Sequence, residues 1–267
     1  MGRVVAISGG DLLTTEKLNL YALKLSGNDS PHVLFIGTAS MDSEGYFEGI
    51  KAAFEKLNCS VRELPLTRGE LDQAEIDERL EWADVIYVGG GDTRTMVKIW
   101  KQYSLDKKLK EIYENDTAVL TGLSAGAICW FVAGHSDSFT DVDESEDSIE
   151  AVDESEDSIA DVNESVCNMA DADVRESSIP DVKGIKYGIA KGMLGLFPYC
   201  FCPHYNEEGR ETFDSMITDT KYDGLALENE TAFVEASREH FIIGSRDGAK
   251  AWDFSGNEKR KLEVRYL

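Results

Sequence analysis

Basic residues are scarce in this chain of 267 residues: 27 lysines and arginines stand against 51 aspartates and glutamates, giving a formal net charge of -24. A protein that binds a phosphate backbone needs clustered positive charge, and no basic stripe is present. The sequence also lacks the run of about eighteen apolar residues that a membrane-spanning helix requires. We therefore expect neither nucleic acid nor a membrane as a partner.

Cysteine is equally sparse. The chain has 5 cysteines, an odd number without the regular spacing of a disulfide framework, and no signal-like segment precedes the apolar pattern that begins at Arg3. These features predict a cytoplasmic protein. Cys200 and Cys202 lie near His204, but no second pair of ligands accompanies them, so we expect no metal and no cofactor.

The negative charge is concentrated in one segment. Between Asp141 and Asp181 there are sixteen acidic residues and one basic residue, Arg175, arranged in imperfect repeats of ten such as DVDESEDSIE and AVDESEDSIA. So few apolar residues cannot offset the entropy lost on ordering. The sequence thus predicts a single α/β domain over residues 1–267, interrupted by an acidic low-complexity insertion at 141–182.

Outside that insertion, short apolar runs alternate with amphipathic stretches, as in a sheet whose strands are joined by helices. This pattern predicts an α/β fold with a mostly parallel sheet sandwiched by helices, in which ligands bind at the carboxyl ends of the strands. The segments ISGG, GTAS, GGGDT and GLSAG all fall at such ends. The expected strands are RVVAISGG, HVLFIGTAS, SVRELPL, ADVIYVGGG and TAVLTGLS, and the expected helices are 15–26, 44–57, 71–82, 93–115 and, toward the end of the chain, about 207–218. The strand-like tail segments GLALEN, TAFVEAS, HFIIGS and KLEVRYL suggest a sheet extension or a hairpin edge.

GLSAG follows the pattern Gly-x-Ser-x-Gly, in which a serine on a sharp strand-to-helix turn exposes its hydroxyl group. Ser124 is therefore the candidate nucleophile. The backbone N–H of Ala125 is expected to face the position of an oxyanion, and GGGDT offers Gly90 or Gly91 as the second donor. A plain strand-to-helix turn also accounts for GGGDT.

A serine nucleophile needs a base, and the chain has only 4 histidines. His204, in the rigid-looking segment FCPHYN, is the strongest candidate, and His135 is the alternative. The base needs an orienting group, which ALENET supplies. In an extended strand Glu228 and Glu230 share one face while Asn229 points the other way. We favour Glu228, with Glu230 as the alternative.

GLSAGAICW, GGGDT and CPHYNEEGR, three motifs of this chain, resemble peptidase family S51, which includes peptidase E (aspartyl dipeptidase) and cyanophycinase. The resemblance implies a fold similar to class I glutamine amidotransferases (flavodoxin-like) and a Ser-His-Glu triad. Its register at ALENET leaves Glu228, Glu230 or Asn229 as the orienting residue.

The implied reaction is cofactor-free serine exopeptidase cleavage of small peptides, preferably Asp-X dipeptides. An acidic substrate side chain needs a cation, for which we expect Arg210, with Arg94 as the alternative. The expected partner is thus a small peptide, and a homodimer is compatible with the sequence.

Two other interpretations are consistent with parts of the sequence. An α/β-hydrolase esterase shares the serine motif, but in that fold the acid precedes the histidine, whereas here His204 precedes Glu228. A catalytically silent binding or sensing protein on the same fold would use the acidic repeats as its functional segment.

Overall fold

The computed structural model describes residues 2–69, 71–139, 181–182, 185–256 and 258–267. The acidic repeats therefore lie almost entirely outside the described residues. No helix in the described part of the chain is long and apolar enough to cross a membrane.

The first sheet contains the five strands that the sequence predicts, side by side and reaching one edge of the sheet. In the described residues its order is β15-β12-β11-β1-β5-β4-β2-β3, and β1 to β5 pair in parallel. The strands β11, β12 and β15 extend one edge, where β11 runs antiparallel to β1. The bounds are β1 Arg3–Ile7, β2 His32–Ile36, β3 Ser60–Glu63, β4 Val85–Val88, β5 Val119–Leu123, β11 Thr231–Ala236, β12 Glu239–Gly244 and β15 Val264–Tyr266.

Helices follow the parallel strands, as expected for crossover connections. The predicted helix 93–115 is divided in two, because Ser104 adopts a left-handed conformation with φ 52° that an α-helix cannot continue through. The helices are α1 Glu16–Leu25, α2 Glu44–Lys56, α3 Gln73–Trp82, α4 Thr93–Gln102 and α5 Leu105–Asn115.

The strands β1, β2, β4 and β5 are buried on both faces. Because successive side chains of a strand point to opposite sides, each face contributes to a different core. Val5 and Ile7 pack with Leu18 of α1 and Phe54 of α2. On the other face, β1 residues join a core formed by α3, α4, α5 and the second sheet. The predicted α/β class, with a mostly parallel central sheet between helices, is confirmed.

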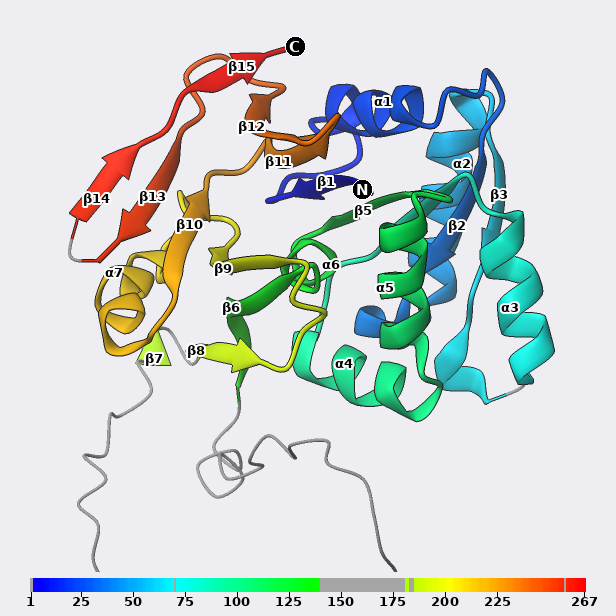
Figure 1. Cartoon of the computed structure of the whole chain (residues 1–267), viewed down its shortest axis with the longest axis horizontal. Coiled ribbons are helices and arrows are strands. Elements are labelled where there is room, and N and C mark those ends of the chain that lie inside the picture. The colour runs from blue at the N-terminus through cyan, green and yellow to red at the C-terminus, as the bar shows by residue number, and fades with distance from the viewer. Residues whose placement is uncertain (1, 70, 140–180, 183–184, 257) are drawn as a thin grey trace, which may run out of the picture.

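A second sheet, which the strand-like tail segments do not predict as a separate sheet, lies beside the first (Figure 1). Its order among the described residues is β14-β13-β10-β9-β6-β8-β7, and Phe213 of the short helix α7 packs against it. The elements are β6 Phe131–Phe139, β7 Asp181–Val182, β8 Ile185–Lys191, β9 Phe197–Cys202, β10 Asp223–Leu227, β13 Ala251–Ser255, β14 Glu258–Lys261 and α7 Phe213–Met216.

Two helices are shorter than predicted. The helix after Ser124, α6, spans only Ala125–Ile128 before the chain enters β6. The helix expected from Glu207 to Thr218 is replaced by α7 between two 3-10 turns, Arg210–Thr212 and Ile217–Asp219. A single turn at α6 makes the helix dipole behind Ser124 smaller than a long helix would supply.

Candidate active site

Ser124 occupies a strained turn at the carboxyl end of β5. Its backbone has φ 56° and ψ -114°, a conformation that is costly for a residue with a side chain, and its N–H donates to the carbonyl of Ile7 at 3.1 Å. The flanking glycines make this turn sterically feasible. A Cβ added at Gly126 would lie 2.1 Å from the Val88 carbonyl oxygen, and one at Gly122 would lie 2.3 Å from the Gly126 carbonyl oxygen.

The GGGDT loop passes close to this serine. A Cβ added at Gly90 would lie 3.3 Å from the Cβ of Ser124, whereas one at Gly91 would collide with the backbone of Ala39. The N–H of Gly90 donates to the hydroxyl of Tyr46 at 3.3 Å. Of the two expected glycine donors, Gly90 therefore lies next to the serine, while Ala125 is buried as the first residue of α6.

His204 reaches Ser124 from the loop after β9. The distance between its Nε2 and the serine Oγ is 2.9 Å. The N–H of His204 donates to Ser8 Oγ at 2.8 Å, and that hydroxyl donates to the Leu227 carbonyl at 2.7 Å. Ser8, fully buried at the end of β1, thus fixes the histidine loop relative to both sheets. The structure brings together the two residues that the sequence predicts as nucleophile and base.

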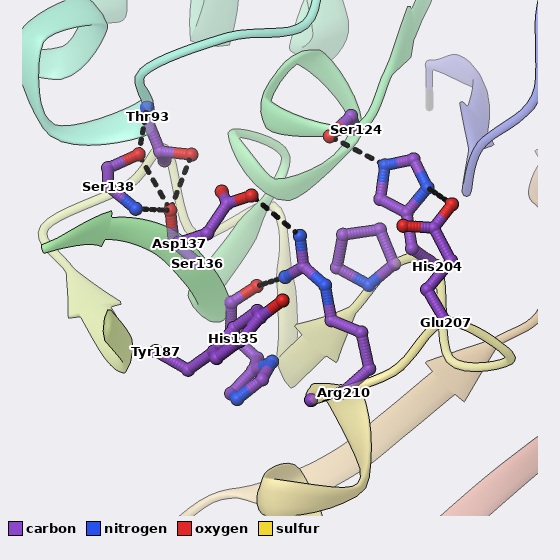
Figure 2. Close-up of polar contacts among 12 residues, drawn as sticks. Thr93, Ser124, His135, Ser136, Asp137, Ser138, Tyr187, His204, Glu207 and Arg210 are labelled. Carbon is purple, nitrogen blue, oxygen red and sulfur yellow. Dashed lines mark hydrogen bonds and ion pairs between the residues drawn. The ribbon is translucent and has the colours of Figure 1, made fainter. Parts of the chain in front are cut away.

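The other nitrogen of His204 faces an amide and a carboxylate (Figure 2 draws the carboxylate). Nδ1 lies 2.7 Å from Asn229 Oδ1 and 3.2 Å from Glu207 Oε1. Asn229 Nδ2 donates to the same Glu207 oxygen at 2.7 Å, which leaves Oδ1 of Asn229 as the acceptor that faces the histidine. This arrangement favours a proton on Nδ1 and an Nε2 that can accept one from Ser124.

Neither favoured acid lies at His204. Glu228 Oε2 accepts from the N–H of Lys250 at 3.0 Å, and Glu230 Oε2 lies 3.1 Å from Arg246 Nε. Glu228 and Glu230 point to Arg246, whereas Asn229 faces His204. The expectation assumed an extended strand, but β10 ends at Leu227 and the turn that follows directs the amide toward the histidine.

Glu207 is a site residue that the sequence pattern did not single out. It lies three residues after His204, and its N–H donates to the His204 carbonyl at 2.8 Å, so a tight turn brings the two side chains together. The contact with His204 lowers the pKa of Glu207 from 4.5 to about 2. Burial opposes this shift, and the hydrogen bond from Asn229 adds to it. An acidic residue three positions after a candidate base is the signal that could have revealed it.

Arg210, the expected cation for an acidic side chain, is buried. Its side chain is 4% exposed, its Nη2 lies 3.2 Å from Asp137 Oδ2, and its Nη1 donates to the His135 carbonyl at 2.9 Å. The guanidinium also lies 5.0 Å from the ring centre of Tyr187. Arg210 therefore faces the partly exposed Asp137 rather than open solvent (Figure 2). Arg94, the alternative, is half-buried in the first turn of α4.

His135, the alternative base, has a different environment. It is fully buried, its Nε2 lies 3.0 Å from Thr212 Oγ1, and its ring stacks on Tyr187. Burial, together with the charge of Arg210, lowers the pKa of His135 from 6.5 to about 3. The ring is therefore neutral at the pH where a peptidase works, and it supports Arg210 rather than Ser124.

Acid should consequently weaken the fold through His135. Because its pKa is lowered in the folded state, the unfolded chain binds a proton that the folded protein excludes between pH 6.5 and about 3, and stability falls as the pH falls through that window. Through this residue we expect the free energy of unfolding of wild type to fall by about 2.5 kcal/mol between pH 7 and pH 4.5. Urea unfolding of wild type and His135→Gln at both values should show a smaller pH dependence in the variant. Equal pH dependence would contradict the assignment.

Comparison with known proteins identifies the family. The model of peptidase family S51 matches residues 4–243. The chain belongs to this family. It is 38% identical over 277 residues to the "Uncharacterized peptidase YgaJ" of Bacillus subtilis (strain 168), an alignment that covers 99% of this chain and 96% of that one. As an S51 member the protein is a serine peptidase.

Two solved structures have a fold similar to that of this chain. A peptidase from an acI-B1 Actinobacterium superposes with a TM-score of 0.66 at 16% identity, covering 99% of this chain and 95% of the other. A putative peptidase E protein from Listeria monocytogenes EGD-e gives a TM-score of 0.58 at 21% identity, covering 91% of this chain and 98% of the other. At these identities the likeness concerns the fold alone.

Proposed function

We propose that this S51 peptidase hydrolyses small peptides with an N-terminal aspartate through an acyl-enzyme formed on Ser124. The observation that carries the proposal is the 2.9 Å contact between Ser124 Oγ and His204 Nε2 at a strained turn after β5. Ser124 Oγ bonds to the peptide carbonyl carbon while His204 takes its proton. The carbon–nitrogen bond then breaks as His204 returns that proton to the leaving amine. Water activated by His204 cleaves the resulting ester and regenerates Ser124.

Stabilisation of the oxyanion is assigned to the backbone N–H groups of Ala125 and of the GGGDT loop, with Gly90 favoured over Gly91 by its closeness to Ser124. The Gly90 N–H would exchange its long contact with Tyr46 for the oxyanion. The preference for an aspartate side chain is proposed from the resemblance to peptidase E, and the expected contact with Arg210 is not part of the proposal, because that guanidinium is buried and already paired with Asp137.

Asn229 and Glu207, rather than Glu228, orient the base in this proposal. Asn229 Oδ1 accepts from His204 Nδ1–H, and Glu207 fixes the direction of the asparagine amide by accepting from its Nδ2. With its pKa near 2, Glu207 is ionised throughout the working range and stabilises the imidazolium that forms when Ser124 attacks.

This assignment is tested by comparing neighbouring residues. We expect Asn229→Ala to lower kcat about 100-fold and Glu207→Gln about 10-fold, because His204 loses its acceptor in the first variant and the charge behind it in the second. Glu228→Gln, the matched control, should stay within about twofold of wild type. The assay is hydrolysis of Asp-Leu and of Ala-Leu, and the second substrate tests the aspartate preference. A loss in Glu228→Gln as large as in Glu207→Gln would refute the assignment.

A further inference from the structure

We infer that Tyr46 is a further catalytic residue, whose hydroxyl group donates a hydrogen bond to the oxyanion that forms when Ser124 attacks the substrate carbonyl. The inference rests on the proposed function and extends it, because the donors assigned above are all backbone N–H groups. Tyr46 lies in the first turn of α2, outside the serine motif, the glycine loop and the histidine loop.

The strand order brings Tyr46 to the edge of the sheet that carries Ser124. The strands β5, β4 and β2 are neighbours and run in parallel, so their carboxyl ends lie side by side. Ser124 follows β5, the GGGDT loop follows β4, and α2 follows β2 after the 3-10 turn Thr38–Ser40. The glycine loop therefore lies between Ser124 and the start of α2.

The hydroxyl of Tyr46 lies at the Gly90 N–H, the loop donor assigned to the oxyanion. That N–H donates to Tyr46 Oη at 3.3 Å, longer than the usual range of about 2.7–3.2 Å. An oxyanion bound by the same N–H would lie about 3 Å from the nitrogen, and two oxygens that share one N–H donor are close neighbours. The tyrosine hydroxyl is thus adjacent to the position where the oxyanion forms.

The proton of this hydroxyl is available to the substrate. Tyr46 Oη accepts from Gly90, and among the residues that the structure describes none accepts the tyrosine proton in return. Burial raises the pKa of Tyr46 above its ordinary value of 10.0, an effect that the hydrogen bond from Gly90 partly offsets. The phenol therefore keeps its proton at neutral pH and can act as a donor.

Contacts on both sides of the ring fix the direction of this hydroxyl. The ring of Tyr46 packs edge-on against the buried Phe35, with the ring centres 5.2 Å apart. On the other side Gly89 lets the loop approach the ring, because a Cβ added there would lie 3.0 Å from Tyr46 Cε1. A donor held in place before the reaction stabilises developing charge without a cost of reorganisation.

The hydroxyl acts when the carbonyl oxygen gains charge. As Ser124 Oγ bonds to the carbonyl carbon, the Gly90 N–H turns from Tyr46 Oη to the new oxyanion, and the tyrosine O–H donates to the same oxygen. The phenol keeps its proton, so the only proton transferred is the one that passes from Ser124 to His204. Because the oxyanion exists only in the tetrahedral species, the contact stabilises the transition state more than the bound substrate.

Tyr46→Phe tests the inference, since it keeps the ring and removes the hydroxyl. Loss of one oxyanion donor costs about 10²–10³ in kcat, and with two backbone donors still present we expect a loss of about 100-fold on Asp-Leu with KM within about threefold of wild type. Labelling by a fluorophosphonate should slow by at least about 10-fold, because its phosphoryl oxygen takes the place of the oxyanion.

Tyr21→Phe is the matched control. Tyr21 of α1 is also partly buried, packs against the same core as Tyr46 and meets Phe241 edge-on. Both kcat and the labelling rate of this variant should equal those of wild type. Circular dichroism should show both variants folded.

A fluorinated tyrosine in place of Tyr46 separates donation to the oxyanion from support of the Gly90 N–H. Fluorine beside the hydroxyl group makes the phenol a stronger donor and a weaker acceptor. Donation to the oxyanion predicts a kcat above that of wild type at neutral pH. An equal or lower kcat would overturn the inference, because the hydroxyl would then act only as an acceptor from Gly90.

The outcomes for the inference and for the proposed function can be told apart. If wild type is labelled and cleaves Asp-Leu while Tyr46→Phe matches it in both, or loses only in KM, the inference fails and the proposed function survives. If wild type is labelled but cleaves no Asp-X peptide, the proposed substrate is wrong and the labelling rates alone decide on Tyr46. With no labelling and no cleavage, both fail.

Discussion

Ser124→Ala is expected to lower hydrolysis of Asp-Leu by at least about 10⁴-fold, because no other group in the proposed mechanism can form the acyl-enzyme. Labelling by a fluorophosphonate should disappear with the hydroxyl. Alanine removes one oxygen atom and leaves the backbone turn in place, so the thermal unfolding midpoint should stay close to that of wild type. The matched control is Ser215→Ala, which changes an exposed serine whose hydroxyl donates to the Thr212 carbonyl. This variant should retain both activity and labelling.

Two outcomes would count against Ser124 as the nucleophile. Residual activity within tenfold of wild type would assign the chemistry to another group. A wild-type protein that accepts no label and cleaves no Asp-X, β-aspartyl or neutral dipeptide would favour the alternative of a catalytically silent binding protein on the S51 fold.

Gly9→Ala is expected to lower kcat at least about 100-fold although the residue takes no part in the chemistry. A Cβ at this position would lie 2.1 Å from Asn229 Oδ1 and 2.2 Å from His204 Nδ1, directly against the hydrogen bond between them. The histidine must move, and a displacement of about 1 Å at a reacting group costs about two orders of magnitude.

The control for this prediction is Gly27→Ala. Gly27 has φ 74°, and an added Cβ would meet no atom within 4 Å, so the variant carries backbone strain without a clash at the site. Activity measurements with circular dichroism should show a folded, nearly inactive Gly9→Ala and a folded, active Gly27→Ala. Full activity in Gly9→Ala would mean that the contact between His204 and Asn229 does not position the base.

The site shows which active-site residues local sequence patterns can predict and which they cannot. Ser124 could be selected because a Gly-x-Ser-x-Gly sequence between an apolar strand and a helix start is typical of an exposed nucleophile, and His204 because only 4 histidines compete. The third residue could not be selected in this way. Strand alternation groups Glu228 with Glu230, but these residues lie in a turn after β10, and which of them meets His204 depends on where β9 and β10 lie in the second sheet.

Arg210 shows a similar limit. The sequence places a charge six residues after the base, in a segment expected to be a surface helix, and charge alone favours contact with an anionic substrate. The structure replaces that helix by short turns and places the guanidinium under Tyr187 and Asp137. Its burial follows from packing between β6, β8 and the turn at 210–212, contacts made by residues far apart in the chain.

The sequence by itself determined the parallel strands, the helices between them and the gathering of small-residue loops at the carboxyl ends, because these follow from hydrophobic periodicity over a few residues. It also determined the nucleophile and base as candidates. Only the tertiary structure decided that Asn229 and Glu207 face His204, that Arg210 is buried, and that Asp137 remains exposed beside it. Those outcomes depend on distances between segments up to about two hundred residues apart, such as Ser8 and His204, which no local pattern encodes.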